Sequence, residues 1–105
     1  MHSTVTEKVP GGKLVRIKID FDKTINSCQI TGDFFCYPED MIEEVEKSIL
    51  GAPAASDILF LKNRIEKKIR ENKTELVGVT SDDIARLITK ALEQKPEGNQ
   101  QVSSS

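Results

Sequence analysis

The sequence predicts an α+β fold, in which a small antiparallel sheet, made of a hairpin with or without a third short strand, packs against three helices. The first observation is a strict alternation of apolar and polar residues from Lys13 to Asp22, which is typical of a half-buried strand. The second is helical spacing of apolar residues near positions 38–50, 57–72 and 81–94. The third is length, because 105 residues with 37% hydrophobic and 30% charged side chains fit one small domain.

The hairpin is predicted from two neighbouring extended runs. In the first run, KLVRIKIDFD, the apolar side chains that share one face are Val15, Ile17, Ile19 and Phe21. After a short polar break, Ile25–Phe35 is expected to return as the antiparallel partner. Gly32 inside this second run indicates a bulge or a close approach of another backbone. Thr74–Val79 is too short to decide between a third strand and an extended linker.

Helix boundaries follow from capping residues. The first helix is expected to begin at Pro38, with acidic residues in its first turn, and to end before Gly51. The second and third helices have as candidate N-caps Ser56 or Asp57, and Thr80 or Ser81, respectively. The polar segment 95–105 lacks periodicity and is predicted to be a disordered tail, which leaves residues 1–94 as the domain.

Composition excludes several classes of protein. A net charge of −2 and a pI near 5.4 argue against a general binder of nucleic acid or of membrane surfaces. No apolar run approaches the ~20 residues that span a bilayer, and the start of the chain lacks a signal sequence, so a cytoplasmic protein is expected. Cys28 and Cys36 are predicted to be reduced, semi-buried thiols. His2 lies in a terminus predicted to be mobile, and we expect it to be a bystander and not a metal ligand.

The stretch KVPGGK is the first candidate for chemistry. A glycine pair lets backbone amides approach an anion, and two flanking ammonium groups add positive charge. The residues concerned are Lys8, Gly11, Gly12 and Lys13. The spacing is not that of a Walker loop, and a turn that leads into a strand needs no ligand. From the residues alone, both interpretations stay open.

The second helix carries a basic run, whereas the first is acidic. The two helices therefore either complement each other or present separate solvated faces. No aromatic residues interleave the basic ones, which disfavours single-stranded nucleic acid as a ligand. The lone histidine is terminal and neither cysteine has an evident base partner, so no catalytic constellation is predicted.

Apolar residues at unusual positions indicate a partner surface. Phe34 and Phe35 are adjacent on an extended segment, so their side chains must point to opposite faces. Leu59 and Phe60 fall outside the apolar stripe of the second helix. Two such sites in a small domain favour an interface. The candidate interface residues are Gly32, Asp33, Phe34, Phe35, Leu59 and Phe60.

Three stretches occur in a familiar order: KVPGGKLVRIKIDFD, ITGDFFCYPED and IEEVEKSILG. Together with the later GVTSDDIARLI, they closely resemble the C-terminal accessory domain of lipoate–protein ligases. The resemblance covers about Glu7 to Leu92, and its patterns K-x-PGGK-L and GDFF-x-x-PE are quite specific. The tail lies outside it.

The resemblance implies a role in a two-step reaction. Ligases of this family use ATP and Mg²⁺ to activate lipoate as lipoyl-adenylate, and pyrophosphate is released. They then pass the lipoyl group to a lysine on the lipoyl domain of a 2-oxoacid dehydrogenase or glycine-cleavage protein. The catalytic pocket belongs to a large N-terminal domain that this chain lacks, and in some archaea the two domains are separate chains.

A chain that starts at Met1, just before the first motif, resembles the small subunit of such a split enzyme. By this resemblance it binds no cofactor alone, has no activity alone, and forms a heterodimer with the catalytic subunit. Lys8 and Lys13 become candidates for acting near the departing pyrophosphate. Two alternatives remain: a free-standing regulatory or adaptor domain, and a small nucleic-acid-binding domain that uses the second helix.

Overall fold

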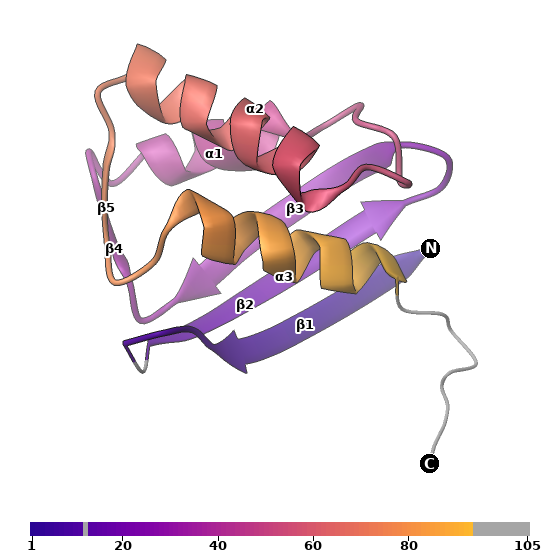
Figure 1. The fold of residues 1–105 in the computed structure, drawn as a ribbon, viewed down its shortest axis with the longest axis horizontal. Coiled ribbons are helices and arrows are strands. Elements are labelled where there is room, and N and C mark those ends of the chain that lie inside the picture. The colour runs from indigo at the N-terminus through magenta and orange to yellow at the C-terminus, as the bar shows by residue number, and fades with distance from the viewer. Residues whose placement is uncertain (12, 94–105) are drawn as a thin grey trace.

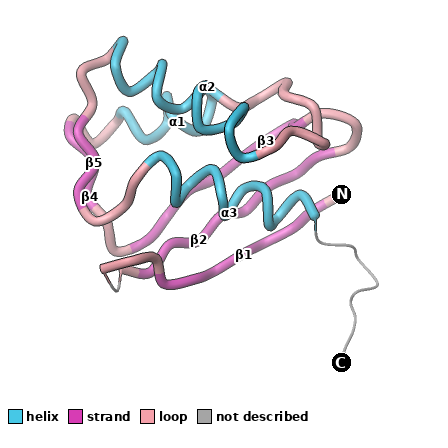
Figure 2. Tube along the Cα trace, in the orientation of Figure 1, coloured by secondary structure: helices cyan, strands magenta, loops and turns pink. Residues whose placement is uncertain are grey.

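The computed structural model describes residues 1–11 and 13–93 as two small antiparallel sheets and three helices, which confirms the predicted α+β class. In chain order the elements are β1 (His2–Lys8), β2 (Leu14–Phe21), β3 (Ile25–Gly32), β4 (Phe35–Tyr37), α1 (Met41–Ser48), α2 (Ile58–Glu71), β5 (Glu75–Val77) and α3 (Ser81–Glu93). Figures 1 and 2 show their arrangement in space. The predicted tail, 95–105, lies outside the described residues.

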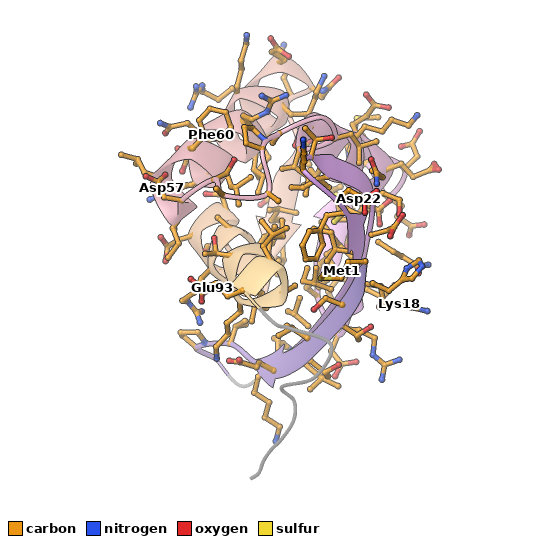
Figure 3. All side chains as sticks on the ribbon, turned by 90° about the vertical axis from the view of Figure 1, so that its right-hand side faces the viewer. Met1, Lys18, Asp22, Asp57, Phe60 and Glu93 are labelled. Carbon is orange, nitrogen blue, oxygen red and sulfur yellow. The ribbon has the colours of Figure 1, made fainter. Side chains whose placement is uncertain are left out.

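The larger sheet has β2 at its centre, paired antiparallel with β1 on one side and β3 on the other. The alternation in β2 is confirmed, because the predicted face of Val15, Ile17, Ile19 and Phe21 is buried and the polar residues between them face outward. Figure 3 shows α3 inside the curve of the sheet and Lys18 on the opposite, outer face. The fully buried large side chains of α3 are Ile84, Leu87 and Ile88. The core therefore lies between the sheet and the helices.

The N-terminal segment differs most from the prediction. Instead of a mobile terminus, His2–Lys8 forms β1, in unbroken register with β2 from His2↔Asp20 to Lys8↔Leu14. Val5 is the one large apolar side chain that β1 buries. β1 pairs with the next strand in the chain, but a strand that buries only one large apolar side chain has almost no local hydrophobic signal. The hairpin is thus two strands of a three-stranded sheet.

The second predicted strand ends earlier than expected, at Gly32 instead of Phe35. A Cβ atom on Gly32 would lie 2.2 Å from the Leu14 carbonyl oxygen, and the Asp33 amide donates to that same oxygen at 2.9 Å. The close approach predicted at Gly32 is confirmed. Because the backbone of β2 fills the space there, the chain turns away and Phe35 begins β4.

The two short strands β4 and β5 form a sheet of their own, with Phe35 opposite Val77 and Tyr37 opposite Glu75. The segment 74–79 therefore contains a strand, not a linker. It does not extend the larger sheet. This second sheet joins segments about forty residues apart in the sequence, and it lies at the left end of the molecule in Figure 1.

Replacing Gly32 with alanine is expected to lower the free energy of unfolding by roughly 1–3 kcal/mol. The added methyl carbon would collide with the backbone at Leu14, which cannot move without disturbing β2. The measurement is urea denaturation followed by circular dichroism. Thr31→Ala, at the exposed neighbour in β3, is the control and should change stability by less than about 0.5 kcal/mol. Equal stability of the Gly32 variant and the wild type would contradict the close approach.

The first helix is shorter than predicted, since α1 spans Met41–Ser48 and Pro38 is not its first residue. Tyr37 is still held in β4, so residues 38–40 must first turn the chain, with the Met41 amide donating to the Pro38 carbonyl at 3.0 Å. Gly51 has φ +83° just beyond the helix, as its predicted role in termination requires.

The caps predicted for the other two helices are confirmed. The Asp57 side chain accepts a hydrogen bond from the Phe60 amide at 2.8 Å and caps α2. At the start of α3, the Asp83 amide donates to the Thr80 hydroxyl at 3.0 Å. The Thr80 amide in turn donates to the Asp83 carboxylate at 3.1 Å. This reciprocal pair fixes the first turn of α3.

Candidate functional site

The KVPGGK turn is a closed, anchored loop. The Val9 amide donates to the Lys13 carbonyl at 2.8 Å, and the Val9 side chain is buried in the core. Gly11 has φ +100°, a conformation that side chains with a Cβ rarely adopt. Gly12 lies outside the described residues. Lys8 and Lys13, at the two ends of the turn, are both exposed. The backbone of the turn is therefore anchored, and its two lysines are at the surface.

Lys13 lies against the turn between β5 and α3. A Cβ atom on Gly78 would be 3.1 Å from Lys13 Cγ, so the aliphatic part of this lysine packs on the glycine. Between the two turns is an open cleft of about 320 Å³. It is lined by Pro10, Gly11, Lys13, Leu76, Gly78, Val79, Thr80 and Asp83. The sequence did not indicate this contact, because nothing local connects residues so far apart.

The acidic residue in this cleft is already engaged. Asp83 is buried, caps the Thr80 amide, and accepts from the Arg86 guanidinium at 2.9 Å. An aspartate with both oxygens occupied in this way stabilises the helix start and is not placed to act as a general base. The described residues of the loop can therefore offer positive charge, whereas the carboxylate in the cleft is not free to accept a proton.

An exposed apolar patch lies beside the loop, on the small sheet. It consists of Phe35, Tyr37 and Val77, which are 57%, 51% and 44% exposed. The two rings stack with centroids 6.4 Å apart, and Val77 pairs directly with Phe35. We call these three residues the aromatic patch. Tyr37 and Val77 were not predicted from the sequence; for Tyr37, the i, i+2 spacing from Phe35 was the available signal.

The split predicted for the two adjacent phenylalanines is confirmed. Phe34 is half-buried against the core, whereas Phe35 belongs to the aromatic patch. Beside them is an open groove of about 370 Å³. Its lining residues are Ile30, Thr31, Gly32, Phe34, Phe35, Cys36, Tyr37, Glu39 and Ile42. Asp33 is exposed next to this groove. The loop, the patch and the groove lie at one end of the molecule, which we call the loop end (Figure 1).

Leu59 and Phe60 are not part of the loop end. They are exposed, at 64% and 42%, as their position off the apolar stripe predicted. They lie in the first turn of α2, and Figure 1 shows that this helix begins away from β4 and β5. Figure 3 shows Phe60 near Asp57, on the far side of the helices from Lys18. The structure thus brings together the loop and Gly32–Phe35, but not the two residues of α2.

The basic run on α2 lies next to the carboxyl end of α1. It helps to form an open cleft of about 450 Å³, lined by Lys47, Ser48, Arg64, Lys67, Lys68 and Glu71. Arg64 Nε donates to the Ser48 carbonyl at 2.9 Å, so this arginine caps α1. Positive charge is favourable at that position because of the helix dipole. Among the described residues, no ion pair joins α1 to α2.

Neither cysteine is set up as a nucleophile. Cys36 is buried and its thiol donates to the Pro38 carbonyl. Cys28 is half-buried beneath α1. Burial, with a smaller contribution from the nearby Glu46 carboxylate, raises the pKa of the Cys28 thiol to about 12. Burial also raises the pKa of Cys36, with Asp40 as a lesser cause. Both thiols therefore stay protonated at neutral pH, as expected for structural cysteines.

Cys28 is expected to react very slowly with thiol reagents in the folded protein, since a pKa of about 12 leaves only about one thiolate in 10⁴ at pH 8. Labelling with a chromogenic disulfide at pH 8, in a Cys36→Ser background, measures this directly. Urea should restore the rate of an ordinary cysteine. Rapid labelling of the native protein would show that the Cys28 thiol is accessible and ionised.

Two further observations limit what the described residues can do. Within residues 1–11 and 13–93, no helix is both long and apolar enough to cross a membrane. In the same ranges, no three His, Cys, Asp or Glu side chains come together as a group that could hold a metal ion.

The loop end thus combines an exposed aromatic patch with a basic glycine turn. No protein-family model and no curated protein sequence matches the chain. Among solved structures, it is similar to a chain from an archaeal lipoylation system of Thermoplasma acidophilum, a bipartite lipoate protein ligase and its E2 lipoyl domain. The two chains are 26% identical with a TM-score of 0.65, and the match covers 84% of this chain and 97% of the other. The resemblance seen in the sequence motifs is thereby confirmed.

Proposed function

We propose that this chain is the accessory subunit of a bipartite lipoate–protein ligase. With a separate catalytic subunit, it is required for ATP-dependent activation of lipoate to lipoyl-adenylate. One observation carries the proposal: the chain that matches over 97% of its length comes from such a two-part ligase system. The order of the KVPGGK and GDFF-x-x-PE motifs supports the same assignment independently.

The loop end is the part that we expect to act in activation. When the lipoate carboxylate attacks the α-phosphate of ATP, pyrophosphate leaves and negative charge builds up on its oxygens. A small domain that closes over the site excludes water and adds positive charge where that group departs. Lys8 and Lys13 are exposed lysines of the closed loop. The buried Val9 side chain anchors the loop backbone between them in the core.

The remaining chemistry is assigned to the partner. ATP, Mg²⁺ and lipoate bind to the catalytic subunit, which also passes the lipoyl group to a lysine of a lipoyl domain. The aromatic patch is the proposed contact with that subunit, because an exposed pair of stacked rings is typical of the buried centre of an interface. The two chains together form a cytoplasmic heterodimer.

The test is a pyrophosphate-release assay with ATP, Mg²⁺ and lipoate on each subunit and on their mixture. This chain alone should release none, because the described residues include no nucleophile, base or phosphate loop that would carry the step. The mixture should release pyrophosphate and form lipoyl-adenylate much faster than the catalytic subunit alone. A stable complex whose rate equals that of the catalytic subunit would contradict the proposal and favour an adaptor role.

A further inference from the structure

The outer edge of β1 presents a regular row of backbone groups. Two hydrogen bonds, one at each end, fix its alignment: the Phe21 amide donates to the Met1 carbonyl, and the Val9 amide donates to the Lys13 carbonyl, both at 2.8 Å. In an antiparallel ladder, alternate residues bond to the neighbour. With the register between these two points unbroken, odd-numbered residues of β1 turn their amides and carbonyls toward β2. The backbone amides and carbonyls of the even-numbered residues therefore point away from β2. These residues are His2, Thr4, Thr6 and Lys8.

The two edges of the larger sheet differ in the partners of their outward backbone groups. On β3, the Ile25 amide donates to the Ala52 carbonyl and the Ile25 carbonyl accepts from the Gly51 amide, both at 2.9 Å. The Ile30 amide donates to the Glu46 carboxylate at 2.7 Å. In the described part of the chain, no such partner serves the outward groups of β1, which forms the open lower edge in Figure 1.

β1 also lacks most of the devices by which proteins usually protect an edge strand, and its one lysine, Lys8, lies at its last position. It contains no proline, glycine or bulge, and its register with β2 is continuous over the whole strand. Glu7 is its one acidic residue, and the Lys90 ammonium group of α3 neutralises it. Such an edge is a template for an added strand, whose main chain would supply the missing hydrogen bonds.

We propose that β1 receives an extended strand of the ligase catalytic subunit, so that the sheet continues across the subunit boundary; this inference rests on the proposed function. β1 ends at Lys8, where the KVPGGK turn begins. A strand bound along β1 is therefore held directly beside the loop that must reach the nucleotide of the same subunit.

A second copy of this chain fits the edge less well. Symmetric pairing of two β1 strands is antiparallel, so the Lys8 end of one copy would lie beside the His2 end of the other. The two loop ends, with their aromatic patches, would then be at opposite ends of the joint. Edge pairing of two short strands alone falls well below the roughly 1,200–2,000 Å² that a stable interface buries. A partner that contacts both β1 and the loop end reaches that area more readily.

The decisive experiment measures hydrogen exchange of individual amides by NMR, on labelled chain with and without unlabelled catalytic subunit. We expect the Thr4 and Thr6 amides to exchange at least about tenfold more slowly in the complex, because they gain hydrogen-bond acceptors. The Val5 and Glu7 amides, already bonded to β2, serve as internal controls and should be slow in both states. This measurement needs no variant and so does not depend on the folding of a mutant.

Proline at Thr4 provides the matching variant. It removes one outward amide but no bond to β2, and edge strands tolerate proline in that orientation. Thr4→Pro should weaken binding of the catalytic subunit by about tenfold, because it removes one main-chain hydrogen bond and its ring obstructs the added strand. Thr4→Ala, which keeps the amide, should bind within about threefold of wild type.

Each outcome decides the inference. Protection of Thr4 and Thr6 in the complex supports it. A complex that forms without this protection overturns it and leaves the proposed function intact. If the two wild-type chains form no complex at all, the proposed function fails and this inference fails with it. Protection that appears in this chain alone as its concentration rises would assign the edge to a second copy and overturn the choice of partner.

Discussion

Formation of lipoyl-adenylate by the mixed subunits is expected to slow by about thirty-fold to several hundred-fold when Lys8 and Lys13 are both changed to alanine. This factor corresponds to the roughly 2–4 kcal/mol that one or two well-placed cations contribute to a transition state with developing phosphate charge. Transfer from pre-made lipoyl-adenylate should barely change, because no pyrophosphate leaves in that step. Single-turnover assays of the two half-reactions measure the contrast.

The controls separate charge from packing. Lys18→Ala with Lys67→Ala makes the same change in net charge at two exposed lysines away from the loop, and should leave both half-reactions unchanged. Lys13→Met keeps an aliphatic stem against Gly78 but removes the charge, so it should behave like Lys13→Ala in activation. An equal loss in both half-reactions, or loss of subunit binding, would make the loop an interface element and refute the charge argument.

The second large effect is expected at the aromatic patch. Changing Phe35 and Tyr37 together to alanine should weaken binding of the catalytic subunit by about thirty-fold to a thousand-fold, since buried aromatic anchors typically contribute 2 kcal/mol or more. Both rings are more than half exposed in the isolated chain, so the stability of the fold should change little. Isothermal titration calorimetry gives the affinity, and thermal denaturation checks the fold.

Leu59→Ala with Phe60→Ala is the matched control for this pair. It removes a similar apolar area from the start of α2, away from the loop end, and should leave the affinity within about threefold. Phe35, Leu59 and Phe60 were predicted from the sequence as parts of one candidate interface, so the comparison tells which side binds. If the α2 pair weakens binding and the Phe35 and Tyr37 pair does not, the partner contacts α2.

Some features could be predicted because their physical cause is local. The alternation in β2 identified a strand and its buried face without any knowledge of the partner strands. Asp57 and Thr80 marked helix starts, because a cap is a bond between residues three apart. Gly32 indicated a close backbone approach, since the lack of a side chain is itself the signal.

Other features were decided only by the tertiary structure. His2 was predicted to lie in a mobile terminus, whereas the structure places it in β1, which buries one large apolar residue and pairs along its whole length with β2. β4 and β5 are three residues each, too short for any periodicity, and they exist because each completes the hydrogen bonds of the other.

The candidate site also combines features that are visible in the sequence with features that depend on the folded chain. Two features of the site can be seen in the sequence: the two lysines around a glycine pair, and the need for Phe34 and Phe35 to face opposite ways. Only the folded chain put Lys13 on Gly78, added Tyr37 and Val77 beside Phe35, and moved Leu59 and Phe60 away from them. The reason is that backbone conformation and capping depend on neighbours in the chain. A surface site, in contrast, combines segments that are far apart in the sequence and come into contact only when the chain has folded.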